Sequence, residues 1–146
     1  TGAMADLEEA IVLARQAVDA TPVDHPARPG RLKKLGNQLE SQYRRTGALA
    51  DLKDAIAIVR QAIDATSNDR SYHAAWSNDL ANKLSRQCVR TGAKADLDEA
   101  IVLAYQAVNA TPDDDPNQAG RLINLGNKLS LRYDRTGAMA DLEEAI

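Results

Sequence analysis

The chain opens with the eleven residues TGAMADLEEAI (1–11), and the same eleven residues occur unchanged at 136–146. Close variants of this stretch begin at residues 46 and 91, so successive copies are 45 residues apart. Residues 1–45 are identical to residues 91–135 at 29 of 45 positions and to residues 46–90 at 20 of them. Self-similarity at a fixed period of this size predicts a repeat architecture, in which each unit packs on its neighbours.

Each unit is predicted to form two helices. In the first, which we name helix B and expect at about 6–20, apolar residues recur at i, i+3, i+4 and i+7 and therefore share one face. They are Leu7, Ala10, Ile11, Ala14, Ala17 and Val18. In the second, which we name helix A and expect at about 26–45, an apolar stripe again follows the helical period. Its members are Leu32, Leu35, Gly36, Leu39 and Tyr43.

The ends of these helices carry further signals. Asp6 and Glu9 have the spacing of an N-terminal capping box. The same spacing recurs in the pairs Asp51/Asp54 and Asp96/Glu99. A glycine follows each helix A, where a left-handed C-terminal cap favours this residue. The three glycines are Gly47, Gly92 and Gly137.

A single helix pair cannot bury its apolar stripe, whereas stacked pairs can, and about three units are needed for stability. No strand-like run separates the helices, so a parallel sheet is excluded. We therefore predict an all-α fold, an α-solenoid of antiparallel helix hairpins. It is expected to form a single domain over residues 1–146, with units 1–45, 46–90 and 91–135 and a partial unit 136–146.

Composition excludes several classes of function. Lys and Arg number 18 and Asp and Glu number 21, so the net charge of -3 is unlike that of strongly basic nucleic-acid-binding proteins. The single cysteine, Cys88, excludes an internal disulfide and is expected in the core. His25 and His73 lie far apart, which favours surface or capping roles over metal binding. No apolar run is long enough to span a membrane.

The sequence also lacks a catalytic constellation. No acid–base pair, activated nucleophile or metal cluster converges, so we predict that the chain is not an enzyme and uses no metal or cofactor. The acidic run at residues 113–115 lacks the alternating spacing and the glycine of a calcium-binding loop. It is interpreted as a solvated helix start.

These units resemble tetratricopeptide (TPR) repeats. The resemblance rests on Leu35-Gly36-Asn37, the turn glycine Gly47, Ala55-Ile56 in the following helix and Thr111-Pro112 after the equivalent helix. The order of these elements matches the family's motif, although the usual TPR unit is about 34 residues long. The resemblance implies a right-handed α-solenoid in which helix A lines a concave groove, and a protein-interaction function.

A narrower resemblance covers the whole chain. Arg-Thr-Gly-Ala-x-Ala-Asp-Leu-x-x-Ala-Ile, with Asp-x-Pro upstream of Arg-Leu-x-x-Leu-Gly-Asn, is similar to TPR-like arrays of fungal and bacterial multidomain proteins. Such arrays commonly sit beside STAND-type nucleotide-binding domains or caspase-like CHAT domains. Asp24-His25-Pro26 with Leu32 and Leu35 also resembles the longer TPR units of kinesin light chains. These resemblances imply the repeat region of a larger, cytoplasmic signalling or defence-type protein.

Charge differs between the two kinds of helix. The helix A segments, residues 26–45, 70–90 and 116–135, carry net charges of +5, +3 and +3, and the rest of the chain is acidic. A basic groove would concentrate acidic ligands such as Asp/Glu-rich peptides. The same pattern is also explained without a ligand, because bases at the end of helix A and acids at the start of helix B complement the helix dipoles.

The face of helix A opposite its apolar stripe supplies the candidate binding residues. One asparagine on this face is identical in all three units, and its amide can both donate and accept a hydrogen bond with a peptide backbone. The predicted groove residues are Asn37, Asn82, Asn127, Lys34, Arg86 and Asn124. The alternative is that these asparagines are structural and bond to the helix of a neighbouring repeat.

Two functions fit these observations. The first is a scaffold or sensor module that binds a protein or peptide, with a preference for acidic segments, in its concave groove. The second is a self-associating array without a groove ligand, in which the first helix of one molecule displaces residues 136–146 of another, head to tail. Neither a membrane nor a nucleic acid is expected as a partner.

Overall fold

The structure, a computed structural model, describes residues 2–66, 70–137 and 144. These residues contain α-helices and no strand, which confirms the predicted all-α class. The helices are α1 (Gly2–Asp19), α2 (Arg28–Thr46), α3 (Leu49–Asp64), α4 (Arg70–Thr91), α5 (Lys94–Asn109) and α6 (Gln118–Thr136). Helix A corresponds to α2, α4 and α6, and helix B to α1, α3 and α5.

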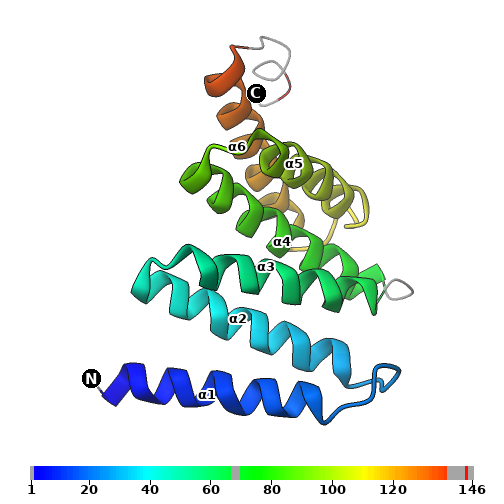
Figure 1. The fold of residues 1–146 in the computed structure, drawn as a ribbon. Coiled ribbons are helices and arrows are strands. Elements are labelled where there is room, and N and C mark those ends of the chain that lie inside the picture. Colours follow the sequence, from blue (N-terminus) through cyan, green and yellow to red (C-terminus); the bar gives the residue numbers. More distant parts are fainter. Residues whose placement is uncertain (1, 67–69, 138–143, 145–146) are drawn as a thin grey trace. The chain divides into compact units, whose positions relative to one another are not determined.

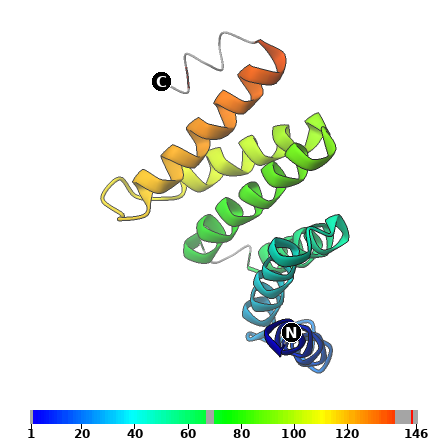
Figure 2. The ribbon, with the colours of Figure 1, turned by 90° about the vertical axis from the view of Figure 1, so that its left-hand side faces the viewer.

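The chain divides into two compact units, Thr1–Asn68 and Asp69–Ile146. The first unit holds α1, α2 and α3, and the second holds α4, α5 and α6 (Figure 1). In each unit a helix A and the helix B that follows it form a tight antiparallel hairpin, α2 with α3 and α4 with α5 (Figures 1 and 2). A further helix packs on each hairpin, α1 on α2 and α6 on α5.

The hairpin turns form as the sequence predicts. Gly47 follows α2 with φ of 68°, a left-handed conformation that residues with a Cβ adopt only at a cost. Its N–H donates a hydrogen bond to the carbonyl oxygen of Tyr43 at 2.7 Å, which closes the last turn of the helix. Gly92 and Gly137 adopt the same conformation, so the three predicted glycine caps are confirmed.

The predicted capping boxes are wrong. The helix α3 begins at Leu49, with Ala48 at its cap position and no side-chain cap bond. Asp51 therefore lies inside the first turn, where its carboxylate accepts hydrogen bonds from Gln42 at 3.1 Å and Thr46 at 3.0 Å. The carboxylate joins the two helices of the hairpin instead of capping one of them.

The same difference is found in the other helices of type B. Asp96 lies inside the first turn of α5 and accepts a hydrogen bond from Gln87 of α4 at 3.0 Å. The helix α1 already begins at Gly2, so Asp6 is a mid-helix residue. The spacing of a capping box was present in the sequence, but the helices begin earlier than the boxes require.

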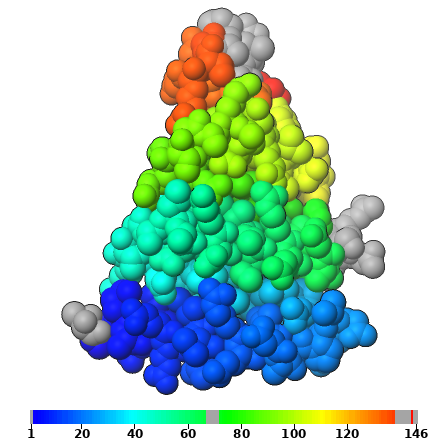
Figure 3. Space-filling model, in the orientation of Figure 1, coloured from blue at the N-terminus to red at the C-terminus, as the bar shows by residue number. Residues whose placement is uncertain are grey.

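The first unit buries its apolar stripes between α2 and α3. The buried residues are Leu32, Leu35 and Leu39 of α2 and Leu52, Ala55, Ile56, Val59, Ala62 and Ile63 of α3. Gly36 of α2 packs closely against Val59 of α3. A Cβ added at Gly36 would lie only 2.7 Å from the Cγ2 atom of Val59. The side chains of α1, α2 and α3 fill the space between the ribbons, as the space-filling view shows (Figure 3).

The second unit is built on the same plan. Leu80, Ala81 and Leu84 of α4 pack into a core with the apolar face of α5. Cys88 is fully buried with a free thiol, which confirms its expected place in the core. His73 lies 3.3 Å from the buried hydroxyl of Ser77, one turn along α4, so this histidine has a local structural role.

The loop from helix B to the next helix A is held by side chains of both. Thr21 donates to the carbonyl oxygen of Ala17 at 2.6 Å and accepts a hydrogen bond from Arg31 at 2.6 Å. His25 is exposed and accepts the N–H of Ala27 at 3.0 Å within the loop, while α2 itself has no side-chain cap bond. The equivalent loop in the second unit has the same arrangement, with Thr111 in place of Thr21.

Candidate interaction surface

In the second unit, α4 and α6 lie side by side, and polar side chains join them. Lys128 of α6 donates a hydrogen bond from Nζ to Oδ1 of Asn82 on α4 at 2.6 Å. Asn124 of α6 donates from Nδ2 to Oδ1 of Asn78 on α4 at 3.5 Å. The Lys128 ammonium also lies 3.4 Å from the carbonyl oxygen of Asn124. Two helices of type A therefore share one polar seam.

Lys128 has unusual electrostatics for a lysine. Only 4% of it is exposed to solvent. Burial, and to a lesser extent the positive charge of Arg86 on α4, together lower the pKa of its ammonium from 10.5 to about 8. Two cations are therefore held close together, one of them out of water, and a nearby anion would stabilise both.

Three of the predicted groove residues belong to this seam. Asn82, Asn124 and Arg86 are half-buried and lie on or beside the contact between α4 and α6. Asn82 bonds to the helix A of the neighbouring repeat, which is the structural role considered above as the alternative. Its hydrogen bond to Lys128 also orients the cation that gives the seam its charge.

The other three lie elsewhere. Lys34 and Asn37 are exposed on α2 in the first unit, where Asn37 accepts a hydrogen bond from Lys33 at 3.0 Å. Asn127 is exposed on α6 and lines a hollow beside α5. The identical asparagines of the three units thus have three different environments.

Two buried lysines were not predicted from the sequence. Lys128 and its repeat equivalent Lys83 each follow one of the identical asparagines, and both are buried. Lys83 forms an ion pair with Asp79 at 2.7 Å, one turn earlier on α4. Recurrence of a lysine beside the identical asparagine was a usable signal, but its burial depends on packing between helices.

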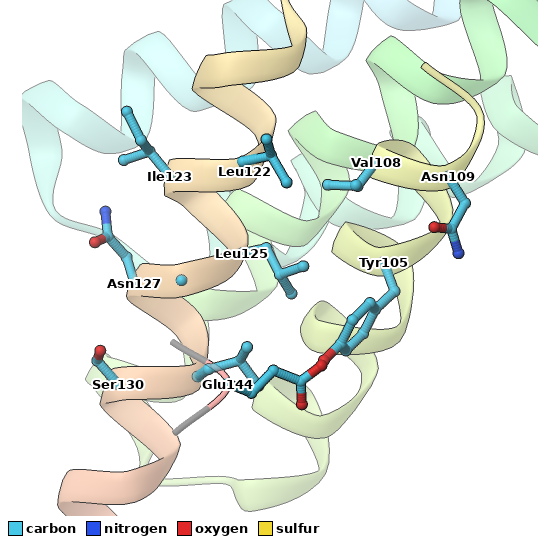
Figure 4. Close-up of a pocket in the computed structure, with 11 residues that line it drawn as sticks. Tyr105, Val108, Asn109, Leu122, Ile123, Leu125, Asn127, Ser130 and Glu144 are labelled. Carbon is cyan, nitrogen blue, oxygen red and sulfur yellow. The ribbon is translucent and has the colours of Figure 1, made fainter. Parts of the chain in front are cut away.

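A second feature of this unit is the hollow between α5 and α6, with a volume of about 590 Å³. Tyr105, Val108 and Asn109 of α5 form one wall, and Glu144 lies at its end (Figure 4). The wall on α6 is formed by Leu122, Ile123, Leu125, Gly126, Asn127, Leu129 and Ser130. This wall on α6 is mainly apolar, and an apolar surface of this kind suits the packing of one side of a helix against it.

Among residues 2–66, 70–137 and 144, no group of three or more His, Cys, Asp or Glu side chains could hold a metal ion. In the same ranges, no helix has both the length and the apolar character that crossing a membrane requires. The two surface features of this unit are therefore the polar seam between α4 and α6 and the hollow between α5 and α6.

Comparison with known proteins identifies the fold. No family model and no curated protein matches the chain. Among solved structures it is similar to nearly identical TPR-like repeats of a protein from Podosopora anserina described as a kinesin light chain. The TM-score is 0.65 at 18% sequence identity, over 99% of this chain and 67% of that one. The fold is a TPR-like helical repeat. The predicted helix-hairpin architecture is confirmed by this similarity.

Proposed function

We propose that this TPR-like chain is a protein-interaction module, not an enzyme, and that it binds an acidic protein segment along its helix A surface. The observation that carries the proposal is the seam between α4 and α6. There the buried Lys128 ammonium is fixed by Asn82 and lies in the field of Arg86. TPR-like repeats offer such helix surfaces without any chemistry of their own.

Electrostatics supports an acidic ligand. Lys128 keeps a charge at neutral pH although burial and Arg86 both oppose it. A carboxylate or phosphate placed beside the two cations reverses this cost, because each cation then gains an opposite charge in a partly buried site. An acidic segment of a protein brings several such groups in a row.

Asparagine amides supply the second kind of contact. Asn124 lies in the same seam, while Asn127, Asn37 and Lys34 are exposed on helices of the same type. In this proposal the amides of Asn124 and Asn127 in the second unit bond to the ligand's backbone, and Lys128 and Arg86 bond to its acidic side chains. The setting we propose is the repeat region of a larger cytoplasmic signalling or defence-type protein, beside a nucleotide-binding or caspase-like domain.

The test uses a fluorescein-labelled oligo-glutamate peptide and fluorescence anisotropy. Wild-type protein should bind it, and the change Arg86→Met or Lys128→Met should weaken binding about tenfold, as expected for loss of one charge-assisted contact. Lys94→Met is the matched control, since Lys94 is an exposed lysine on α5 with its own ion pair to Asp98. Circular dichroism verifies that each variant folds.

Two results would contradict the proposal. One is an anisotropy that stays flat for the wild-type protein at low salt. The other is equal weakening by Lys94→Met, which would show attraction to net charge and not to the seam. Tighter binding of duplex DNA than of the peptide, with a steep salt dependence, would assign the basic surface to nucleic acid instead.

A further inference from the structure

The buried lysines of α4 and α6 differ in their counter-charge. Lys83 and Lys128 occupy the same repeat position, and both are buried. On α4 the carboxylate of Asp79, four residues before Lys83, pairs with the lysine ammonium at 2.7 Å. The residue four positions before Lys128 is Asn124, which is the repeat equivalent of Asp79. The aspartate of the middle repeat is therefore an asparagine in the third, and the local carboxylate is replaced by a neutral amide.

The other contacts of Lys128 do not supply the missing charge. Its ammonium donates to Oδ1 of Asn82 at 2.6 Å and lies 3.4 Å from the carbonyl oxygen of Asn124, and both acceptors are neutral. In the described part of the chain, no carboxylate is paired with this ammonium. Buried charges in proteins are ordinarily paired, because removing a lone ion from water is costly. The seam thus holds a buried cation that the described residues do not neutralise.

A second cation makes the site suited to a group with two negative charges. Arg86 of α4 lies close enough to Lys128 for its charge to contribute to the lowered pKa of the ammonium. A single carboxylate carries one negative charge and offsets only one of the two cations. A phosphate monoester carries about two negative charges at neutral pH and presents three acceptor oxygens. One phosphate can therefore accept hydrogen bonds from the ammonium and from the guanidinium at once.

The polar side chains around the ammonium reach the solvent. Asn82, Asn124 and Arg86 are half-buried, although Lys128 itself is buried. The hydrogen bond from Asn124 to Asn78 is 3.5 Å long, which is beyond the usual range for such a bond. The amide of Asn124 is therefore weakly held, and its movement toward a ligand costs little.

We propose that the seam is a phosphate site, in which a phosphorylated serine or threonine of the bound protein segment takes the place that Asp79 has beside Lys83. This inference rests on the proposed function, because it names the group that the acidic segment brings to Lys128 and Arg86. Asn124 determines the specificity of the site, since its neutral amide leaves the charge of Lys128 to the ligand. Binding of the partner is then controlled by phosphorylation of the partner.

The test compares four fluorescein-labelled peptides by fluorescence anisotropy with the full chain. Three are oligo-glutamate peptides of equal length whose central residue is serine, glutamate or phosphoserine. The fourth has the central glutamate and one further glutamate at its end, so that its net charge is close to that of the phosphoserine peptide. Wild-type protein should bind the phosphoserine peptide about tenfold more tightly than either glutamate peptide, as expected for one further charge-assisted contact.

The change Asn124→Asp tests the residue that determines specificity. It places a carboxylate four residues before Lys128, as Asp79 is placed before Lys83, so the midpoint of urea unfolding should rise. The same carboxylate should repel the phosphate, so the preference for phosphoserine over glutamate should be lost. A gain in stability together with a loss of binding cannot result from misfolding. A lower midpoint for this variant would contradict the missing counter-charge at Lys128.

Asn109→Asp is the matched control. It adds the same charge at an exposed residue of α5, whose repeat equivalents Asp19 and Asp64 are already aspartates. This variant should keep the wild-type preference for the phosphoserine peptide. Inorganic phosphate should compete with that peptide only at a much higher concentration, because the ion lacks the contacts of the flanking segment. Competition at the concentration of the peptide would assign the site to a free phosphate ion and overturn the proposal.

The outcomes separate this inference from the proposed function. Equal affinity for the phosphoserine peptide and the charge-matched glutamate peptide overturns the phosphate site and leaves the acidic ligand standing. Absence of binding for all four peptides overturns both. A preference for phosphoserine that survives Asn124→Asp also overturns the inference, because the phosphate would then be bound away from Lys128.

Discussion

Gly36 of α2 and Val59 of α3 approach so closely that a Cβ on Gly36 would lie 2.7 Å from Cγ2 of Val59. No such approach is sterically allowed for a real side chain, so glycine is needed at this position of the first hairpin because Val59 faces it. In the second hairpin both partners differ: Ala81 replaces the glycine and Ala104 replaces the valine, and both are buried. The side-chain volume that α5 lacks relative to α3 is thus supplied by α4.

The first prediction concerns this pair. Gly36→Ala should destabilise the chain by about 1–2 kcal/mol, because overpacking outweighs the better helix propensity of alanine. Adding Val59→Ala should recover part of this loss, since the double variant recreates the pair found in the second hairpin. Urea unfolding of the four proteins of the double-mutant cycle measures the coupling.

Gly30→Ala is the control on the same helix. A Cβ on Gly30 meets nothing within 4 Å, so the change should be neutral or stabilise by about 0.5–1 kcal/mol. Equal destabilisation by Gly30→Ala and Gly36→Ala would contradict the steric explanation.

The second prediction separates the identical asparagines. Asn82→Ala should destabilise the chain by about 1–3 kcal/mol, because it leaves the buried Lys128 ammonium without its partner at 2.6 Å. Asn127→Ala, on an exposed residue of α6, should change stability by less than about 0.5 kcal/mol. Chemical unfolding of both variants is the measurement. A larger loss of stability for Asn127→Ala than for Asn82→Ala would contradict the structural role that the seam gives to Asn82.

The third prediction is a pH dependence due to Lys128. Its pKa is about 8 in the folded chain, below the ordinary value of 10.5. Between these values the unfolded chain holds the proton more tightly, so stability should rise with pH from about 8 to 10.5. Below pH 8 both states are protonated, and the cost of the buried charge is fully present. Acidic ligands should bind more weakly as pH rises through this window.

Lys128→Met isolates this effect. The variant should lack the rise in stability, so the difference between its unfolding free energy and that of the wild type should shrink above pH 8. Lys94→Met, which removes an exposed lysine, should keep the wild-type dependence. A constant difference between wild type and Lys128→Met over the whole range would refute the assignment to this group.

The fourth prediction concerns the loop before helix A. Thr111 accepts a hydrogen bond from Arg121 at 2.5 Å and donates to the carbonyl of Ala107 at 2.6 Å. Thr111→Val removes both, and we expect a loss of about 1–3 kcal/mol. Thr66, which follows α3, is the repeat equivalent of Thr111, and Trp76 is the repeat equivalent of Arg121. Thr66→Val should therefore cost less, and comparison of the two midpoints in urea checks this.

The sequence alone was sufficient for the repeat and for most of the helices. Periodicity and turn glycines are local signals, and Gly47, Gly92 and Gly137 follow helix A with positive φ as expected. The buried stripe of Leu32, Leu35 and Leu39 was also predictable, because amphipathic spacing fixes which side of a helix is apolar. The starts of the helices of type B could not be predicted in the same way, because the spacing of a capping box did not show where each helix begins.

Tertiary structure decided what identical residues do. Asn37, Asn82 and Asn127 share one sequence position, yet only Asn82 is bonded to Lys128 of the adjacent helix A. Leu32 and Leu122 also share a position, yet one is buried and the other half exposed. In a repeat protein the local sequence sets each helix and its apolar face, whereas burial and charge at that face depend on which helix packs against it.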